Sequence, residues 1–146
     1  LLERPELRDH LDFSQPIALL LVAVLHFIED TQRAYEIART LYDALPSGSY
    51  VVLSHALTNP VIEKGMEHTR AIYSRTNSGG YPRTMEQIQG FFTGLTPVGS
   101  GLAHATEWSL PGRPPGLMGD GSLASVGDPS TLKSLPVIFG VARVDR

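Results

Sequence analysis

A run of nine apolar residues without a polar interruption constrains the fold more than any other feature of the sequence. It extends from Ile17 to Leu25, and four polar or aromatic side chains follow it closely: His26, Phe27, Glu29 and Asp30. Such a run has no face for water, so a strand made from it is expected to be buried on both sides, as in a parallel α/β sheet. Open α/β sheets bind ligands at the carboxyl ends of their strands. We therefore expect a buried strand over residues 17–26 that presents His26 to a ligand.

Length and composition describe one globular domain. The chain has 146 residues, 42% of them hydrophobic, and a formal net charge of −3 without a long basic run. This charge argues against nucleic acid or an anionic membrane as the main partner. The lack of cysteine excludes disulfides, thiol chemistry and cysteine-ligated metal sites. No targeting pattern is visible and the apolar run is too short to span a bilayer, so we expect a cytoplasmic protein.

The residues after the apolar run predict a helix and a second strand. Over residues 31–45, apolar side chains recur at the helical period, and Asp30 or Thr31 can cap the start. Residues 49–55 are rich in β-branched and aromatic side chains, which favour a strand. Strand, helix and strand in this order form a βαβ unit, whose two strands are parallel.

Weaker patterns complete a single domain over residues 1–146. One helix is expected over residues 61–73, and a firmer one begins at Thr84, which forms a capping box with Gln87. Residues 95–108 resemble a strand that proline and glycine interrupt, and residues 135–144 resemble a last strand. Between these two strands lies a long Pro- and Gly-rich loop, residues 109–134, and loops of this length are functional or disordered.

Three motif matches carry little weight. Residues 119–124 fit the dinucleotide pattern G-x-G-x-x-A, but they neither follow a predicted strand nor open a clear helix. Ser54 and His55 lack the G-x-S-x-G context of a hydrolase nucleophile. The five histidines show no H-E-x-x-H or comparable spacing, so we expect no metal site.

His26 and His55 stand apart because each ends a predicted parallel strand. The carboxyl ends of neighbouring parallel strands lie at one edge of a sheet, so both rings could reach one crevice. A histidine there can act as a general base or orient a substrate group. Alternatively, each ring packs at its strand end and bonds a loop backbone group. Both interpretations stay open for His26, and packing is favoured for His55.

Three segments resemble a known family. The phrases LLLVAVLHFI, LPSGSYVVLSH and FFTGL stand in the order and spacing of the actinobacterial S-adenosylmethionine-dependent methyltransferases of the family 19 type, formerly a domain of unknown function. The likeness covers residues 1–108 well and residues 135–144 loosely. It implies the Rossmann-like α/β fold of class I methyltransferases, with strand order 3-2-1-4-5-7-6 and strand 7 antiparallel.

On that plan the chain corresponds to the C-terminal half of the fold. Residues 17–26 and 49–55 resemble strands 4 and 5, and residues 95–108 and 136–144 resemble strands 6 and 7, giving the order 4-5-7-6. The family's glycine turn and ribose-binding acid precede strand 4. We therefore expect a truncated domain that alone binds the cofactor weakly or not at all.

The resemblance also implies roles for individual residues. S-adenosyl-L-methionine is the expected cofactor, and an unidentified small molecule is the expected methyl acceptor. Val24, Leu25, His26 and Phe27 would lie beside the reactive end of the cofactor, with His26 as the catalytic base or orienting group. We expect His55, Glu29 and Asp30 on the substrate side, although Asp30 can instead cap the next helix.

Two other functions stay open. The chain could be a non-catalytic, degenerate methyltransferase half that acts as an interaction or regulatory module. A different doubly wound enzyme, such as a reductase, is a more remote alternative.

On the methyltransferase plan, strand 4 pairs with strand 1, which this chain lacks. An apolar edge is therefore expected to be exposed along residues 17–25. We expect the chain to self-associate, or to accept a partner strand, along that edge.

Overall fold

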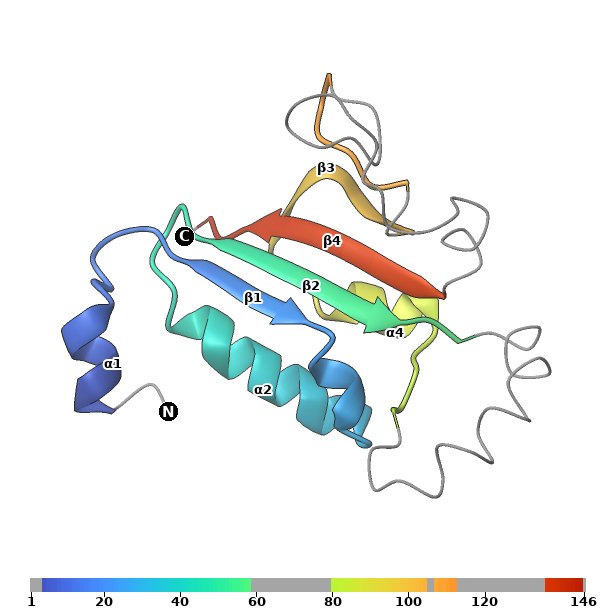
Figure 1. The fold of residues 1–146 in the computed structure, drawn as a ribbon, viewed down its shortest axis with the longest axis horizontal. Helices are drawn as coiled ribbons and strands as arrows, with labels where there is room; N and C mark the ends of the chain where they lie inside the picture. The colour runs from blue at the N-terminus through green and yellow to red at the C-terminus, as the bar shows by residue number, and fades with distance from the viewer. Residues whose placement is uncertain (1–3, 59–79, 105–106, 113–135, 146) are drawn as a thin grey trace, which may run out of the picture.

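The computed structural model describes residues 4–58, 80–104, 107–112 and 136–145. In this part of the chain, one four-stranded sheet packs against helices (Figure 1). The elements are α1 (Pro5–His10), β1 (Ala18–Val22), the 3-10 helix η1 (Leu25–Phe27), α2 (Thr31–Asp43), β2 (Tyr50–Ala56), α4 (Met85–Gly90), β3 (Thr96–His104) and β4 (Val137–Arg143).

The sheet has the strand order β1-β2-β4-β3. β1 and β2 are parallel and α2 joins them, which confirms the predicted βαβ unit. β4 lies between β2 and β3 and is antiparallel to both. This arrangement is the order 4-5-7-6 with an antiparallel strand 7, as the resemblance implies. The class I methyltransferase fold is therefore confirmed for the half of the sheet that the chain contains.

α2 buries one face against the sheet. Ala34, Ala38 and Tyr42 lie four residues apart along this face and are almost fully buried. They share the core with Leu21 of β1 and Leu53 of β2. The spacing places them in one stripe, so the helical period predicted for residues 31–45 is confirmed.

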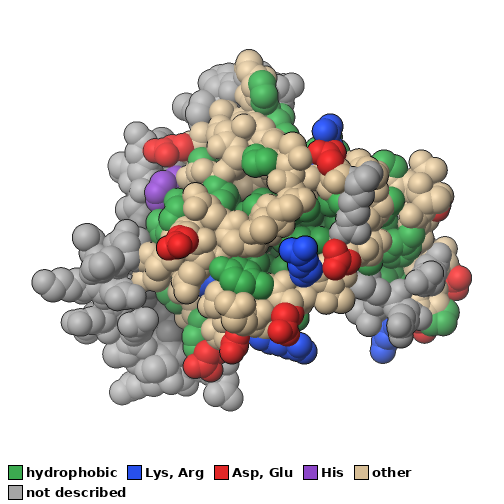
Figure 2. Space-filling model, turned by 180° about the vertical axis from the view of Figure 1, so that it is seen from behind, with side chains coloured by type: hydrophobic (Ala, Val, Ile, Leu, Met, Phe, Trp, Pro, Cys, Tyr) green, Lys and Arg blue, Asp and Glu red, His purple; other side chains and the backbone are tan. Residues whose placement is uncertain are grey.

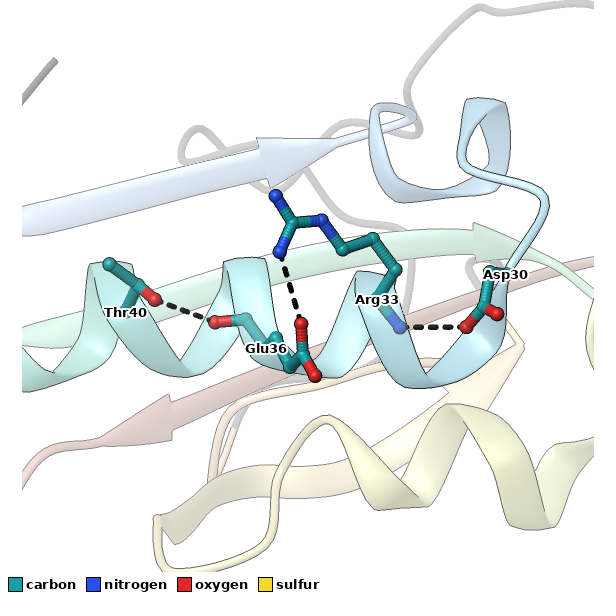
Figure 3. Close-up of polar contacts among 4 residues, drawn as sticks. All are labelled: Asp30, Arg33, Glu36 and Thr40. Atoms are coloured by element: carbon teal, nitrogen blue, oxygen red, sulfur yellow. Dashed lines mark hydrogen bonds and ion pairs between the residues drawn. The ribbon is translucent and has the colours of Figure 1, made fainter.

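Polar contacts fix the start and the exposed side of α2 (Figure 3). The Asp30 carboxylate accepts a hydrogen bond from the Arg33 backbone N–H at 2.8 Å, which caps the first turn. Arg33 also forms an exposed ion pair with Glu36 at 3.1 Å. The Thr40 hydroxyl donates to the Glu36 carbonyl oxygen at 2.8 Å. The exposed ion pair contributes little stability, whereas the cap decides where the helix begins.

α4 packs beside α2 in the same core. Its capping box between Thr84 and Gln87 is confirmed, with both reciprocal hydrogen bonds present. The Tyr35 hydroxyl of α2 donates to the Gln87 carbonyl oxygen at 2.7 Å, and the Tyr35 and Phe91 rings meet edge to face at 4.7 Å. Ile88 completes the contact and is fully buried. α4 therefore holds the residues before it against α2 and β2.

The first strand differs from its prediction in length. The sequence pattern extends the strand to His26, but β1 ends at Val22 and residues 25–27 form η1. Ala23 has φ = 53°, in the left-handed region, which turns the chain out of the extended conformation. Apolar composition alone did not reveal this turn.

The burial of β1 also differs from its prediction. Leu21 is 6% exposed, whereas its neighbours Leu20 and Val22 are 62% and 48% exposed. Burial on both sides is therefore wrong for this chain as it stands. β1 is an edge strand of the sheet, and no labelled helix covers the front of the sheet in Figure 1. Figure 2, the view from behind, shows acidic and basic side chains scattered over the opposite side.

β3 and β4 lie within the two strands predicted over residues 95–108 and 135–144, but β3 ends earlier, at His104. β3 carries the expected interruption, a register shift between Val98 and Leu102, with Gly99 and Gly101 at positive φ. The helix predicted over residues 61–73 and most of the loop over residues 109–134 lie outside the described residues. In the described ranges, no helix has the length and apolarity that a membrane span requires.

Candidate active site

Two histidines meet at the carboxyl ends of the parallel strands. β1 leads into η1, which carries His26, and β2 carries His55 one residue before its end. The centroids of the two rings are 5.7 Å apart and the rings meet edge to face. The sequence placed both side chains at this edge, and the structure brings them together.

The turn after β1 is held in a strained conformation by β2. A non-glycine residue in the left-handed region costs roughly 1–2 kcal/mol. The backbone N–H of Ala23 compensates by donating to Ser54 twice, to the carbonyl oxygen at 3.3 Å and to the hydroxyl at 3.0 Å. Backbone strain of this kind is concentrated at functional sites. Here the left-handed turn at Ala23 directs the chain away from β1 and toward the end of β2.

Arg83 is a central residue of the site that sequence analysis missed. Its side chain is buried, at 1% exposure. The guanidinium donates to the carbonyl oxygens of Leu25 at 3.1 Å and Ile28 at 2.7 Å. It also donates to the Thr31 hydroxyl at 3.2 Å. No motif marks a buried arginine, because this side chain is usually exposed.

The ring of His55 is locked in one neutral tautomer. Its Nε2 lies 2.9 Å from Nη1 of Arg83, and a guanidinium can only donate, so Nε2 accepts. Nδ1 therefore carries the proton and donates to the Ala56 carbonyl oxygen at 2.8 Å. Burial lowers the pKa of His55 to about 4, and the charge of Arg83 acts in the same direction. With both nitrogens engaged and 1% exposure, His55 offers no atom to a substrate in this structure.

His26 has the opposite character. Its ring is half-buried and contacts Phe27, with the ring centroids 4.5 Å apart. Its Nδ1 is buried and has no hydrogen-bond partner among the described residues. Burial lowers the pKa of His26, and the nearby charge of Arg83 lowers it further. Both effects favour the neutral ring, which is the form that accepts a proton.

The residues expected beside the cofactor are not equally accessible. Val24 and Phe27 are 49% and 56% exposed, so their side chains form an apolar surface next to His26. Leu25 is 1% exposed and packs in the core, so it contributes packing rather than direct contact. An apolar surface and a neutral histidine fit one wall of a site for S-adenosylmethionine, which is partly apolar. Leu25 fits only as a support for that wall.

The two acidic candidates also differ. Glu29 and Asp30 are both exposed, but the Asp30 carboxylate caps α2. Glu29 lies beside the turn and does not cap the helix. Among the described residues, no cluster of three metal-ligating side chains is present. Two open hollows of the described surface, one lined by residues 99–100 and 109–112 and the other by residues 9–14, include none of the candidate residues.

The neutral state of His55 makes the stability of the fold depend on pH. Its pKa is about 4 in the folded chain and near the ordinary 6.5 in the unfolded chain, so the unfolded state binds more protons between these values. Stability is therefore complete above about pH 6.5 and falls as the pH decreases toward 4. After a discount for solvent screening, we expect a loss of about 1 kcal/mol between pH 7 and 5 in urea unfolding.

Substitution separates His55 from other titrating groups. His55→Gln should weaken this pH dependence, whereas His10→Gln, at an exposed position of α1, should leave it unchanged. A wild-type stability that does not change between pH 7 and 5 would contradict the assignment. So would a pH dependence as large in His55→Gln as in the wild type, since His26, whose pKa burial also lowers, accounts only for a remainder.

Comparison with solved structures agrees with this architecture. The chain is 29% identical to a DUF574 family protein from Streptomyces avermitilis, with a TM-score of 0.78 and coverage of 98% of this chain and 50% of that one. It is 27% identical to a candidate methyltransferase from Thermobifida fusca, with a TM-score of 0.67 and coverage of 99% and 49%. A SAM-dependent methyltransferase from Methanosarcina mazei shares the fold at 13% identity, with a TM-score of 0.54 and coverage of 92% and 61%.

The chain thus spans about half the length of the first two of these proteins. No curated protein matches the sequence significantly. The model of the S-adenosyl methyltransferase family matches residues 1–143, nearly the whole chain. The sheet order, the site at its carboxyl edge and this match lead to one conclusion: the chain belongs to the S-adenosyl methyltransferase family.

Proposed function

We propose that the chain supplies the acceptor-side half of an enzyme that transfers a methyl group from S-adenosylmethionine to a small molecule. The observation that carries the proposal is the half-buried ring of His26, whose buried Nδ1 has no hydrogen-bond partner among the described residues, beyond the carboxyl end of a strand in the 4 position of a class I sheet. When bound, the cofactor supplies an electrophilic methyl group on a sulfonium. The residues of this chain position the acceptor and accept its proton.

The proposed roles follow from accessibility. Val24 and Phe27 exclude water from one side of the reacting groups, because their apolar side chains are exposed beside His26. His26 accepts the acceptor's proton or orients its nucleophile by a hydrogen bond. Glu29 contacts the acceptor at the rim. His55 is buried and does not contact the acceptor. It acts indirectly, through its hydrogen bond with Arg83.

The context of the enzyme is part of the proposal. We propose a truncated domain whose glycine-rich, cofactor-binding half is supplied elsewhere, and a cytoplasmic site of action. The alternative is an interaction module built from a degenerate half. The coding sequence before Leu1 discriminates the two functions. An in-frame glycine-rich strand-turn-helix followed by a strand ending in an acid supports the enzyme, and a start codon near Leu1 supports the module.

Substitution of His26 tests the catalytic role in a chain that includes the cofactor-binding half. His26→Ala should lower kcat for methyl transfer by about 100-fold or more, the usual contribution of a general base. The dissociation constant of S-adenosylmethionine should change little, because Val24 and Phe27 keep the apolar wall. Production of S-adenosylhomocysteine measures the rate, and calorimetry measures cofactor affinity.

His10→Gln is the matched control, because this histidine lies on α1 and is exposed. It should leave both the rate and the affinity unchanged. An unchanged kcat in His26→Ala would contradict the role assigned to His26. Loss of cofactor binding without a change in kcat would make His26 a binding residue instead.

We also propose that the free edge of β1 accepts a further strand. β1 pairs with β2 alone among the described strands, and Leu20 and Val22 expose apolar side chains beside the unpaired backbone. In the 146-residue chain alone, a second copy of β1 takes that place. Sedimentation should show self-association at concentrations on the order of tens of micromolar.

A charged residue at the exposed position tests the edge. Leu20→Lys should shift the equilibrium toward monomer, because a charge on an edge strand opposes pairing. Thr40→Lys, on the exposed face of α2, is the control and should not change association. A stable wild-type monomer over the same concentration range would contradict the proposal.

A further inference from the structure

The segment over residues 80–83 clamps the turn that carries His26. The backbone N–H of Tyr81 donates to the carbonyl oxygen of His26 at 2.6 Å. A side chain at Gly80 would meet the His26 ring, because a Cβ there would lie 3.5 Å from Cδ2. Arg83 adds its hydrogen bonds to Leu25 and Ile28. The carbonyls on both sides of His26, and its own, are therefore all bound by this one segment.

The clamp is anchored on β2. The backbone N–H of Arg83 donates to the Ala56 carbonyl oxygen at 3.0 Å, and the N–H of Thr58 donates to the Arg83 carbonyl oxygen at 2.9 Å. Leu57 and Arg83 form an isolated parallel bridge. The position of Arg83 is thus fixed relative to the end of β2, so its side chain transmits that position to the turn after β1.

No carboxylate of the described residues forms an ion pair with Arg83. In the described ranges, the ion pairs are Arg33–Glu36 and Arg143–Asp145, both exposed. A buried guanidinium is costly unless its N–H groups are satisfied, and here two carbonyl oxygens, a hydroxyl and the His55 nitrogen accept from four of its five N–H groups. The ring of Phe91 lies 5.7 Å from the guanidinium carbon and adds a cation–π contact. A side chain that only filled space could be apolar at much lower cost.

We propose that Arg83 is a positioning residue for methyl transfer: its guanidinium fixes the backbone on both sides of His26 and, through His55, ties that backbone to β2. The inference rests on the proposed function for its catalytic meaning. It goes beyond that function by assigning the orientation of His26 to one buried cation and one neutral histidine. His55 serves as the hydrogen-bond acceptor that aims the guanidinium.

The charged and titratable groups around His26 and Arg83 determine how the pKa of His26 should respond to substitution. Arg83 and His55 face His26 from the clamp and from β2. Asp30 and Tyr35 act on Arg83 from α2, and Glu86 of α4 acts on Tyr35. Removal of Arg83 takes away a positive charge that acts on His26, so the pKa of His26 should rise, while removal of a distant surface arginine should not change it.

The test observes the imidazole nitrogens of the 146-residue chain by 15N NMR over a pH titration. In the wild type, His55 should appear as the Nδ1–H tautomer and should not titrate above about pH 5. Arg83→Gln should release this tautomer and raise the pKa of His26. Arg83→Lys should preserve the charge effect on His26 but lose the fixed tautomer of His55. Arg33→Gln, at an exposed arginine, should reproduce the wild-type spectra.

Several outcomes would overturn the proposal. One is a wild-type His55 that carries its proton on Nε2 or titrates near pH 6.5, and this result does not depend on a variant that folds. Another is a folded Arg83→Gln variant whose His26 and His55 resonances titrate as in the wild type. These measurements need no methyl acceptor, so they separate the failure of the clamp from the failure of the proposed function.

The rate of methyl transfer then tests the positioning role of Arg83, in a chain that includes the cofactor-binding half. Arg83→Lys should lower kcat at least tenfold with little change in KM for the cofactor, because His26 remains but loses its orientation. An unchanged kcat in a variant with altered His55 spectra would overturn the positioning role. A wild type without any transfer would instead count against the proposed function.

Discussion

The parallel pairing of β1 with β2 is the constraint on which the rest of the structure depends. The register runs from Ala18 opposite Tyr50 to Val22 opposite Ser54, so both strands end at the same edge. Ser54 can then bind the backbone of Ala23 just as the strained turn begins. That turn lifts His26 over His55. A shift of one residue in the register of β1 would turn its buried side chains to the other face. It would remove both the contact between Ser54 and Ala23 and the contact between His26 and His55.

This pairing also explains how a buried arginine is tolerated. Arg83 lies where the ends of two strands and the start of α2 supply hydrogen-bond acceptors without formal charge, namely Leu25, Ile28, Thr31 and His55. Burial and the guanidinium both keep the histidines neutral. Among the described residues, the site therefore combines one buried cation with neutral imidazoles, and of the two rings only that of His26 has a buried nitrogen without a hydrogen bond.

Local patterns predicted the elements well where local physics decides them. The capping box at Thr84, the apolar stripe of α2 and the β-branched run of β2 each act over a few residues, and each appears in the structure. The early end of β1 escaped prediction because Ala23 has no sequence signature for a left-handed conformation. Arg83 escaped because its role depends on contacts across about fifty residues of chain, such as that with Thr31.

The exposed face and edge of β1 define what this half of the fold lacks. A wholly apolar strand with Leu20 and Val22 exposed suits the interior of a larger sheet, and the chain spans half the length of its structural relatives. Under the proposed function, Val24, His26 and Phe27 would form one wall of a cofactor crevice, and the cofactor-binding half would supply the other wall. The most direct measurement is calorimetric titration of the 146-residue chain with S-adenosylmethionine. The account predicts no binding, or a dissociation constant on the order of millimolar. Micromolar or tighter binding at one site per chain would contradict it.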